Sequence, residues 1–397
     1  MRQLLRDGAI VDVRTGRAIV DGAILVAGER IEAVGRSADF GEQPDGATVV
    51  ELGGAFVVPG FVDPHVHVAF TSEPDALERV SANAWHLAAR NTWMLLESGV
   101  TTAADCGGPG ELTLRLKQAI DHGDVAGARL LVSLNPITTR SGHCNSFGAL
   151  ADDADSARTV ARALIARGAD FIKVMASGGG TRGATPATEP QFSQASLEAI
   201  VDEAHAAGLH VAAHARAPIA IRRAVLAGVD RIEHMTFETD SGVAYDQEIV
   251  REMVARDTWA DPTLPAGVRA LASEHVGLER RTELRKQFAW RYPNYRLLAG
   301  AGVRLLCGTD AGTPLVMFDD FALGPELLSQ VVGYSPAEAL TSATLWGAQA
   351  LGVDDSRGSL EPGKLADLVV LEENPLDDPS AMRSVKRVML GGHWQEH

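Results

Sequence analysis

The rhythm of hydrophobic and polar positions changes twice along the 397-residue chain. Residues 1–57 carry short runs of apolar and β-branched residues separated by Gly and Asp, a pattern typical of strands and tight turns. Residues 353–397 have the same pattern, whereas residues 58–352 alternate short apolar runs with longer helix-like stretches. This alternation predicts β/α units around a parallel sheet. We therefore expect an α/β domain at 58–352 and one small β-sandwich built from both termini, with two separate β appendages as the alternative.

Eight apolar runs in the central segment are candidate strands, and several helix-like stretches between them end in Gly, which is a helix C-terminal signal. The candidate strands are 57–68, 100–106, 128–135, 169–177, 209–215, 230–235, 257–263 and 303–310. Eight strands with intervening helices match a (β/α)8 TIM barrel. An open doubly wound sheet is the alternative, but the Gly-rich phosphate turn expected after its first strand is absent from the sequence.

The charge balance limits the partners that the protein can have. The chain has 36 Lys and Arg against 52 Asp and Glu, a net charge of −16, which repels phosphate backbones and anionic lipid. Its three cysteines are too scattered for a disulfide framework, and it has neither a signal peptide pattern nor an 18-residue apolar run. We expect a cytoplasmic protein that acts on a small molecule and binds neither nucleic acid nor membranes.

The first candidate strand ends in a pair of histidines with the geometry of metal ligands. His65 and His67 are two residues apart, so on a strand both imidazoles point to one face. Two imidazole nitrogens at that spacing suit zinc or a similar divalent ion. Because barrel enzymes place their active sites at the C-terminal ends of the strands, this position favours a metal site over a structural pair.

Lys173 lies in the fourth candidate strand among apolar neighbours. A buried ammonium is costly, and loss of solvation lowers the pKa of a lysine until the amine is neutral. A neutral amine can add CO₂ to form a carbamate, an anionic group whose two oxygens can bridge two cations. The alternative is a lysine whose ammonium reaches solvent at the strand end.

Three further polar residues end the later candidate strands. His214 closes the fifth strand and His234 the sixth, so we interpret them as ligands of a second metal ion that Lys173 bridges. Asp310 ends the eighth strand and would neighbour the first strand across barrel closure. From there it could touch both the first metal ion and the attacking water.

Six motifs together resemble the amidohydrolase superfamily over nearly the whole chain. They are PGFVDPHVH, FIKVMASGG, HVAAHA, RIEHM, GTDAGTP and the terminal PGKLADLVVL, the last of which is similar to the composite β-sandwich of these enzymes. The resemblance implies two divalent ions, with zinc as the expected metal. It implies that the buried ion is held by His65, His67, carbamylated Lys173 and Asp310, and the exposed ion by Lys173, His214 and His234. The stretch 171–238 further resembles the imidazolonepropionase-like and Xaa-Pro or Xaa-Arg dipeptidase-like branch of metal-dependent carboxypeptidases.

The expected reaction is hydrolysis of a C–N bond in an amide, dipeptide, N-acyl amino acid, carbamate or urea. A metal-bridging hydroxide would attack the carbonyl carbon, and Asp310 would act first as general base and then as general acid. A lactonase or esterase on the same site is one alternative. A mononuclear heterocycle deaminase is a weaker one, because Lys173 is present and the glutamate expected after the fifth strand is not. A catalytically dead scaffold conflicts with the complete ligand set.

The substrate contacts are less defined by the sequence. By resemblance, His143 would stabilise the substrate carbonyl or its oxyanion, although it could also be a loop histidine without a role. Arg216 stands where dipeptidase-like relatives commonly have Tyr; it could pair with a substrate carboxylate or lie solvated on the surface. Arg182 belongs to the Gly-rich segment 178–186, which we interpret as a mobile loop near the site. Cys144 has no additional base that would make it a nucleophile. Similar enzymes commonly self-associate, so we expect a homo-oligomer.

Overall fold

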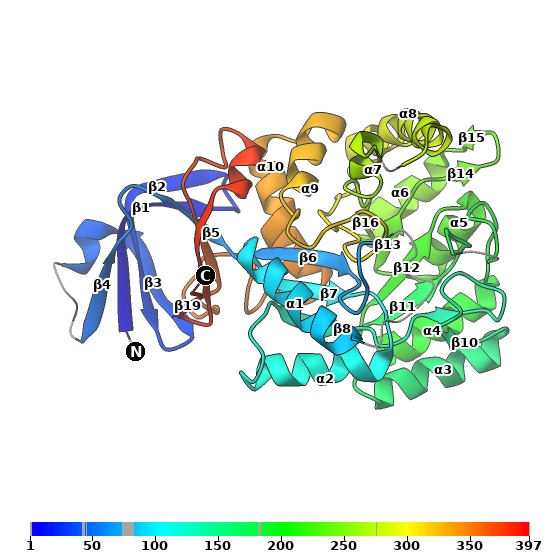
Figure 1. Ribbon diagram of the computed structural model, residues 1–397, viewed down its shortest axis with the longest axis horizontal. Coiled ribbons are helices and arrows are strands. Elements are labelled where there is room, and N and C mark those ends of the chain that lie inside the picture. The colour runs from blue at the N-terminus through cyan, green and yellow to red at the C-terminus, as the bar shows by residue number, and fades with distance from the viewer. Residues whose placement is uncertain are drawn as a thin grey trace. The chain divides into compact units, whose positions relative to one another are not determined.

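The computed structural model describes residues 2–41, 44, 46–73, 83–181, 184–274 and 276–396 (Figure 1). The chain divides into two compact units, the first comprising Met1–Asp63, Trp93–Thr102 and Asp319–His397, and the second Pro64–Thr92 and Ala103–Phe318. The division thus groups the chain from Asp319 onward with the terminal strands, whereas the sequence pattern put the boundary at residue 352. The three predicted domain ranges stay predictions.

The first unit contains an eight-stranded sheet made from both ends of the chain. Its order is β19-β18-β17-β5-β1-β2-β3, with β4 beside β1. The strands are β1 (Arg2–Asp12), β2 (Arg17–Ala27), β3 (Arg30–Arg36), β4 (Ala47–Glu51), β5 (Phe56–Pro59), β17 (Leu368–Leu371), β18 (Val385–Leu390) and β19 (His393–Trp394). β17 runs antiparallel to β5 with Leu368 opposite Pro59, and the Trp394 indole donates a hydrogen bond to Gln3 Oε1 at 3.0 Å. Both termini therefore build one β unit, and the alternative of two separate appendages is wrong. Its description as a sandwich stays a prediction.

This terminal unit is held by a core that also draws on both ends of the chain. Ile24 from the N-terminal strands and Leu368 from the C-terminal ones are fully buried in one apolar cluster. Short helical segments complete the unit: Ser37–Phe40, α9 (Leu323–Leu327), Leu328–Val332, α10 (Pro336–Thr341), Ser342–Trp346, α11 (Gly347–Ala350) and Pro379–Arg383.

The strands of the central segment follow the predicted runs. They are β6 (Phe61–Val66), β7 (Val100–Asp105), β8 (Arg129–Val132), β11 (Ile172–Met175), β12 (Val211–Ala215), β13 (Arg231–His234) and β16 (Trp259–Asp261), with the short β9 (Ile137–Thr138), β10 (Ala149–Leu150), β14 (Glu238–Thr239) and β15 (Gly242–Val243). β6, β7 and β8 form one sheet, and β10-β9-β11-β12-β13-β16 form a second sheet whose pairs are parallel. β11 and β12 are buried at every position, as expected for a parallel sheet covered on both faces.

The eighth predicted strand is present as isolated parallel bridges rather than as a regular strand. Leu305 bridges to Ala260 of β16, and Ala311 bridges to Val66 of β6. The segment 303–311 therefore lies between the last and the first strands of the central segment. The prediction of parallel β/α units is confirmed, while the closed eight-stranded barrel stays a prediction.

Several helices of the central segment begin or end at the capping signals of their own sequence. They are α1 (Ala84–Glu97), α2 (Gly110–Asp121), α3 (Ala154–Ala166), α4 (Gln194–Ala206), α5 (Pro218–Ala227), α6 (Gln247–Arg256), α7 (Val268–Ala272) and α8 (Leu278–Gly300). Asp153 caps α3 by accepting a hydrogen bond from the Ser156 amide at 2.8 Å, and Gly228 ends α5 with φ 89°. Helix α8 was not predicted. It contains Pro293, which removes one backbone donor from the helical ladder and masks the helical pattern.

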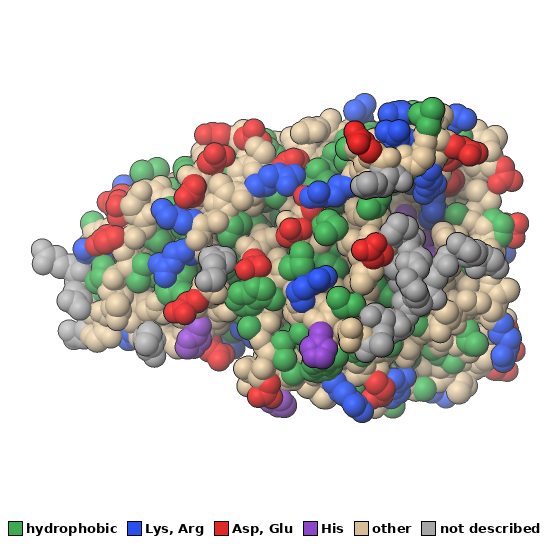
Figure 2. All heavy atoms as spheres, in the orientation of Figure 1, with side chains coloured by type: hydrophobic (Ala, Val, Ile, Leu, Met, Phe, Trp, Pro, Cys, Tyr) green, Lys and Arg blue, Asp and Glu red, His purple; other side chains and the backbone are tan. Residues whose placement is uncertain are grey.

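The surface carries both signs of charge. Figure 2 shows acidic and basic side chains mixed across the visible face, with hydrophobic ones scattered among them. Within the described part of the chain, the helices do not combine the length and apolar character needed to cross a membrane.

Candidate active site

A cavity of about 850 Å³ opens in the second unit at the C-terminal ends of its strands. It is lined by all six residues predicted to bind metal, namely His65, His67, Lys173, His214, His234 and Asp310. The predicted substrate residues His143 and Arg216 also line it, whereas Arg182 lies outside the described residues. The fold therefore gathers side chains up to 245 positions apart in sequence into one cavity, although their roles as ligands stay predictions.

His65, His67 and Asp310 form the first candidate metal group. Asp310 Oδ1 lies 3.4 Å from the Nε2 atoms of both histidines, and one potential ligand atom from each residue falls within 4.8 Å of the others. The Asp310 amide donates to the His65 carbonyl at 2.8 Å, which fixes this residue beside the end of β6. Asp310 adopts φ 64°, an unusual conformation that turns its side chain into the cavity.

Hydrogen bonds to backbone carbonyls fix the protonation pattern of two imidazoles. His67 Nδ1 lies 2.8 Å from the Gly107 carbonyl, and His214 Nε2 lies 3.0 Å from the Gly178 carbonyl. Because a carbonyl only accepts, each of these nitrogens carries the proton and the opposite nitrogen keeps its lone pair. This is the arrangement that metal-binding histidines adopt.

Burial keeps the imidazoles neutral. Loss of solvation, reinforced by the neighbouring cationic side chains, lowers the pKa of His65, His214 and His234 well below the ordinary value of 6.5. Their rings are close together, with centroids 5.6 Å apart for His65 and His234 and 4.5 Å apart for His214 and His234. Several neutral imidazoles with their lone pairs gathered in one buried place are suited to binding a divalent cation.

Lys173 is 1% exposed and lies on the same strand face as His214. In the β11–β12 register Lys173 is opposite Ala212, two positions before His214. Burial lowers the pKa of Lys173, which favours the neutral amine. Its Nζ contacts Glu233 Oε2, and Glu233 Oε1 lies 3.4 Å from Arg231 Nη2. Arg231 is positively charged at all relevant pH values and can balance the negative charge of Glu233. Glu233 therefore does not need Lys173 to be protonated. The prediction that Lys173 faces the site instead of reaching solvent fits this geometry.

Glu233 and His234 are consecutive residues, yet both contribute to the site. A regular strand would send them to opposite faces. His234 has φ 66° and Met235 φ 47°, so the chain leaves the extended conformation where β13 ends. The sequence pattern indicated His234 as a ligand but did not indicate Glu233.

Two residues from the end of β16 orient histidines of the site and were missed by the sequence analysis. Asp261 Oδ2 lies 3.2 Å from His65 Nδ1, and Thr263 Oγ1 lies 2.8 Å from His234 Nδ1. Burial raises the pKa of Asp261 to about 7. The signal that could have found Asp261 is a carboxylate at the end of the seventh apolar run, where the other strands also end in site residues.

A second group of potential ligands is formed by His65, Cys106 and Glu233. Burial raises the pKa of Cys106 to about 11, so the sulfur is a thiol at neutral pH and a poor metal ligand. It instead donates to Glu233 Oε1 at 3.3 Å. We therefore assign Cys106 to the hydrogen-bonding layer beneath the site.

His143 is held beside the predicted metal ligand His214 by a short chain of hydrogen bonds. Its ring centroid lies 4.7 Å from that of His214, and burial lowers its pKa to about 3, so it is neutral. The Cys144 amide donates to Thr181 Oγ1 at 3.0 Å, and that oxygen also contacts His143 Nδ1. A threonine hydroxyl can donate to His143 Nδ1 while it accepts from the Cys144 amide, so this contact suits an imidazole that carries its proton on Nε2. Burial raises the pKa of Cys144 to about 12, which argues against Cys144 as a nucleophile.

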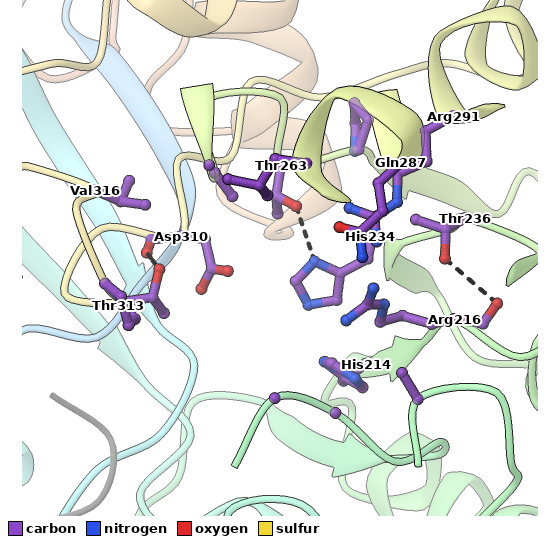
Figure 3. A pocket seen from close by; sticks show the side chains of 18 of the residues that line it. His214, Arg216, His234, Thr236, Thr263, Gln287, Arg291, Asp310, Thr313 and Val316 are labelled. Atoms are coloured by element: carbon purple, nitrogen blue, oxygen red, sulfur yellow. Dashed lines mark hydrogen bonds between the residues drawn. The ribbon is translucent and has the colours of Figure 1, made fainter. Parts of the chain in front are cut away.

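Arg216 shares a carboxylate with a second arginine that the sequence analysis missed. Glu238 Oε2 accepts from Arg216 Nη2 at 2.5 Å and from Arg291 Nη2 at 2.8 Å. Burial tends to raise the pKa of Glu238, but the two guanidinium groups outweigh it and lower the pKa. Two cations and one anion leave one positive charge, and the Nε atoms of both arginines are buried without a hydrogen-bond partner among the described residues. Figure 3 shows Arg216 beside His214 and His234, with Asp310 on the other side of the cavity, so Arg216 is not a solvated surface residue.

Comparisons with known proteins agree with this geometry. The sequence pattern of the amidohydrolase family matches residues 56–394. The chain is 26% identical over 408 residues to ochratoxinase from Aspergillus niger, and the match covers 94% of this chain and 82% of the relative. It is 28% identical over 389 residues to imidazolonepropionase from Micrococcus luteus, and that match covers 90% of this chain and 89% of the relative. A crystal structure of a Xaa-Pro dipeptidase with methionine bound in its active site matches with a TM-score of 0.89 at 27% identity, covering 100% of both chains. The chain therefore belongs to the amidohydrolase family, whose members hydrolyse carbon–nitrogen bonds.

Proposed function

We propose that the protein is a binuclear metal-dependent hydrolase that cleaves the C–N bond of an N-acyl amino acid, a dipeptide or a related amide bearing a carboxylate. One observation carries this proposal: neutral imidazoles, a buried lysine and a carboxylate converge on one cavity, and backbone carbonyls fix the free lone pairs of His67 and His214. That donor set fits divalent zinc, which prefers imidazole nitrogen and carboxylate oxygen.

The chain offers ligands for two ions. His65, His67, Asp310 and a carbamate on Lys173 would hold the buried ion, and the same carbamate with His214 and His234 would hold the exposed one. When bound, divalent ions lower the pKa of a water molecule to near 7 and polarise the carbonyl under attack.

Three protein side chains complete the mechanism. Asp310 Oδ1, which faces His65 and His67, takes a proton from the attacking water and returns it to the departing nitrogen. His143 donates a hydrogen bond from its Nε2–H to the carbonyl oxygen, where negative charge develops in the transition state. Arg216 binds the substrate carboxylate through donors that Glu238 leaves free.

The relatives support an amino-acid moiety in the substrate. The Xaa-Pro dipeptidase structure holds methionine, which carries a carboxylate, in its active site. In this chain Arg216 and Arg291 supply the positive charge that such a group requires. The cytoplasmic location and the self-association expected from the sequence stay predictions.

The test begins with metal analysis of protein produced with zinc and bicarbonate, followed by a screen of dipeptides, N-acyl amino acids, carbamates, ureas and lactones. We expect about two ions per chain and turnover of amides. Asp310→Asn should keep most of the metal while activity falls by orders of magnitude, whereas the exposed Asp319→Asn should behave like wild type. One metal ion with ammonia release from a heterocycle, or turnover of lactones alone, would contradict the proposal.

A further inference from the structure

Helix α8 presents one continuous face to the cavity. Most of its cavity-lining residues recur three or four positions apart, as one side of a helix requires: Arg280, Leu284, Gln287, Phe288, Arg291, Tyr292 and Tyr295. Trp290 and Leu297 lie on the remaining surface and are 38% and 54% exposed. One helix thus forms a whole wall of the cavity, and its sequence determines what that wall offers.

The chemistry of this wall changes with distance from the metal-binding residues. At one end the Tyr295 hydroxyl donates to the His234 carbonyl at 2.8 Å. One turn closer to the helix N-terminus, Arg291 carries the cationic group paired with Glu238. Phe288 and Leu284 follow at three and seven positions beyond Arg291. At 1.5 Å per residue, Leu284 lies about 10 Å farther along the helix axis than Arg291.

Beyond Arg291, the α8 wall carries the apolar Leu284 and Phe288 as well as the polar Gln287 and Arg280. Gly267 lies opposite Leu284 and Phe288, and Leu264 of the same loop also lines the cavity. The side chains of Leu264, Leu284 and Phe288 are only 4%, 4% and 8% exposed. The Phe288 ring stacks on Tyr292 with centroids 5.1 Å apart, which restrains its orientation. Gly267 has φ 82°, and a Cβ added there would come within 3.1 Å of Leu284 Cδ2. Because glycine has no Cβ, its backbone can lie close to Leu284 without a side chain occupying the cavity. These contacts build a defined apolar recess within the cavity.

We propose that this recess, formed by Leu264, Leu284 and Phe288, is a specificity subsite for a large apolar or aromatic group of the substrate. This inference rests on the proposed function and names its substrate class: an amino-acid conjugate with a carboxylate at Arg216 and Arg291, and with an aryl or long alkyl group beyond it. Small N-acetylated amino acids would leave the recess empty and gain nothing from burial of apolar surface.

The experiment measures binding separately from turnover. Zinc-loaded Asp310→Asn protein is titrated by calorimetry with N-acetylglycine, N-octanoylglycine, N-benzoylglycine and N-acetylphenylalanine. N-methyloctanamide, which lacks the carboxylate, tests the arginine pair. The same titrations use a second set of proteins in which Phe288→Ala, Phe288→Leu or Trp290→Ala is added. Trp290→Ala is the matched control, because it truncates an aromatic side chain of the same helix outside the cavity.

We expect at least one of the three larger carboxylates to bind about tenfold more tightly than N-acetylglycine, since one or two buried apolar groups have an effect of this size. Phe288→Ala should remove most of that gain, Phe288→Leu part of it, and Trp290→Ala none. A gain below threefold, or one that Phe288→Ala leaves in place in a folded protein, overturns the proposal. If the larger ligands bind tightly but the wild-type enzyme hydrolyses none of the corresponding amides, the proposed function fails and the subsite remains.

Discussion

Removing the Thr181 hydroxyl should slow the reaction by changing which nitrogen of His143 carries the proton. The Thr181 oxygen accepts from the Cys144 amide and contacts His143 Nδ1, so the hydroxyl can donate its own proton to that nitrogen. In Thr181→Val the shape is kept but the donor is lost. Nδ1 can then carry the proton, and Nε2 would have none to donate to the substrate.

The structure sets the size of the effect. A net hydrogen bond is worth about 0.5–1.5 kcal/mol, and this energy is what biases the two neutral forms of His143. At 1.4 kcal/mol for each factor of ten, turnover should fall by about two- to tenfold in Thr181→Val. His143→Ala removes the donor itself and should cost about 100- to 1000-fold. The loss in Thr181→Val must therefore be a small fraction of the loss in His143→Ala.

Steady-state kinetics on the best amide found in the screen would measure both kcat and KM. Thr181→Ser keeps a hydroxyl and should restore most of the activity. Thr188→Val is the control within the same segment, because Thr188 donates to Asp240 at 3.0 Å rather than to a histidine. If Thr181→Val has the kcat of the wild type while His143→Ala has a much lower kcat, the argument that Thr181 selects the tautomer of His143 is wrong. If neither variant is impaired, His143 does not stabilise the transition state.

Three further outcomes follow from the same geometry. Asp261→Asn should weaken zinc binding by about 10- to 100-fold in a chelator competition. His65 Nδ1 and the Thr263 amide contact different oxygens of Asp261, Oδ2 and Oδ1, and in asparagine one of these becomes an NH2 group that cannot accept. Unchanged affinity would mean that Asp261 does not orient His65. Gly179→Ala should lower kcat with little loss of metal, because a Cβ there would lie 2.5 Å from the His143 ring; wild-type kcat would show that the loop adjusts. Burial lowers the pKa of His143 in the folded protein to about 3, whereas the ordinary pKa of a histidine in the unfolded chain is 6.5, so between these values only the unfolded chain binds the proton. The free energy of unfolding of the metal-free protein should therefore decrease as the pH falls from 6.5 toward 3, and it should decrease less in His143→Gln. Equal pH slopes of the unfolding free energy from urea titrations would contradict this sign.

The convergence of the predicted metal ligands on one cavity could be predicted because it depends on local rules. His65 and His67 are two apart on a strand, and parallel strands place their C-terminal ends at one edge, so polar residues that end apolar runs must meet there. The same reasoning could not find Glu233. A strand that ends in His234 sends its preceding residue to the other face unless the backbone turns, and only the structure shows φ 66° at His234.

The substrate side of the site depends on contacts between distant elements, and the sequence pattern was weaker there. Arg216 was noticed because it follows a predicted ligand by two residues, but its shared partner Glu238 and the second cation Arg291 come from different elements. Arg291 lies in α8, a helix with many charged residues and an internal Pro293, whose apolar periodicity is too weak to indicate which face is buried. The residues on which the proposed substrate class rests therefore came together only in the fold.

Helix α8 links the predicted metal ligand His234 to the cavity wall through backbone hydrogen bonds. His234 and Met235 both have positive φ, a conformation that costs about 1–3 kcal/mol per residue unless neighbours enforce it. The enforcing contacts come from α8, where Tyr295 donates to the His234 carbonyl and Asn294 to the Met235 carbonyl at 3.3 Å. The residues that hold a metal ligand in its unusual conformation are thus on the helix that carries Arg291 and the apolar recess. A sequence change that shifts or tilts α8 also moves Tyr295 and Asn294, whose hydrogen bonds hold His234 and Met235. We therefore expect substrate range to change most easily through side chains such as Phe288, whose replacement leaves the helix axis in place.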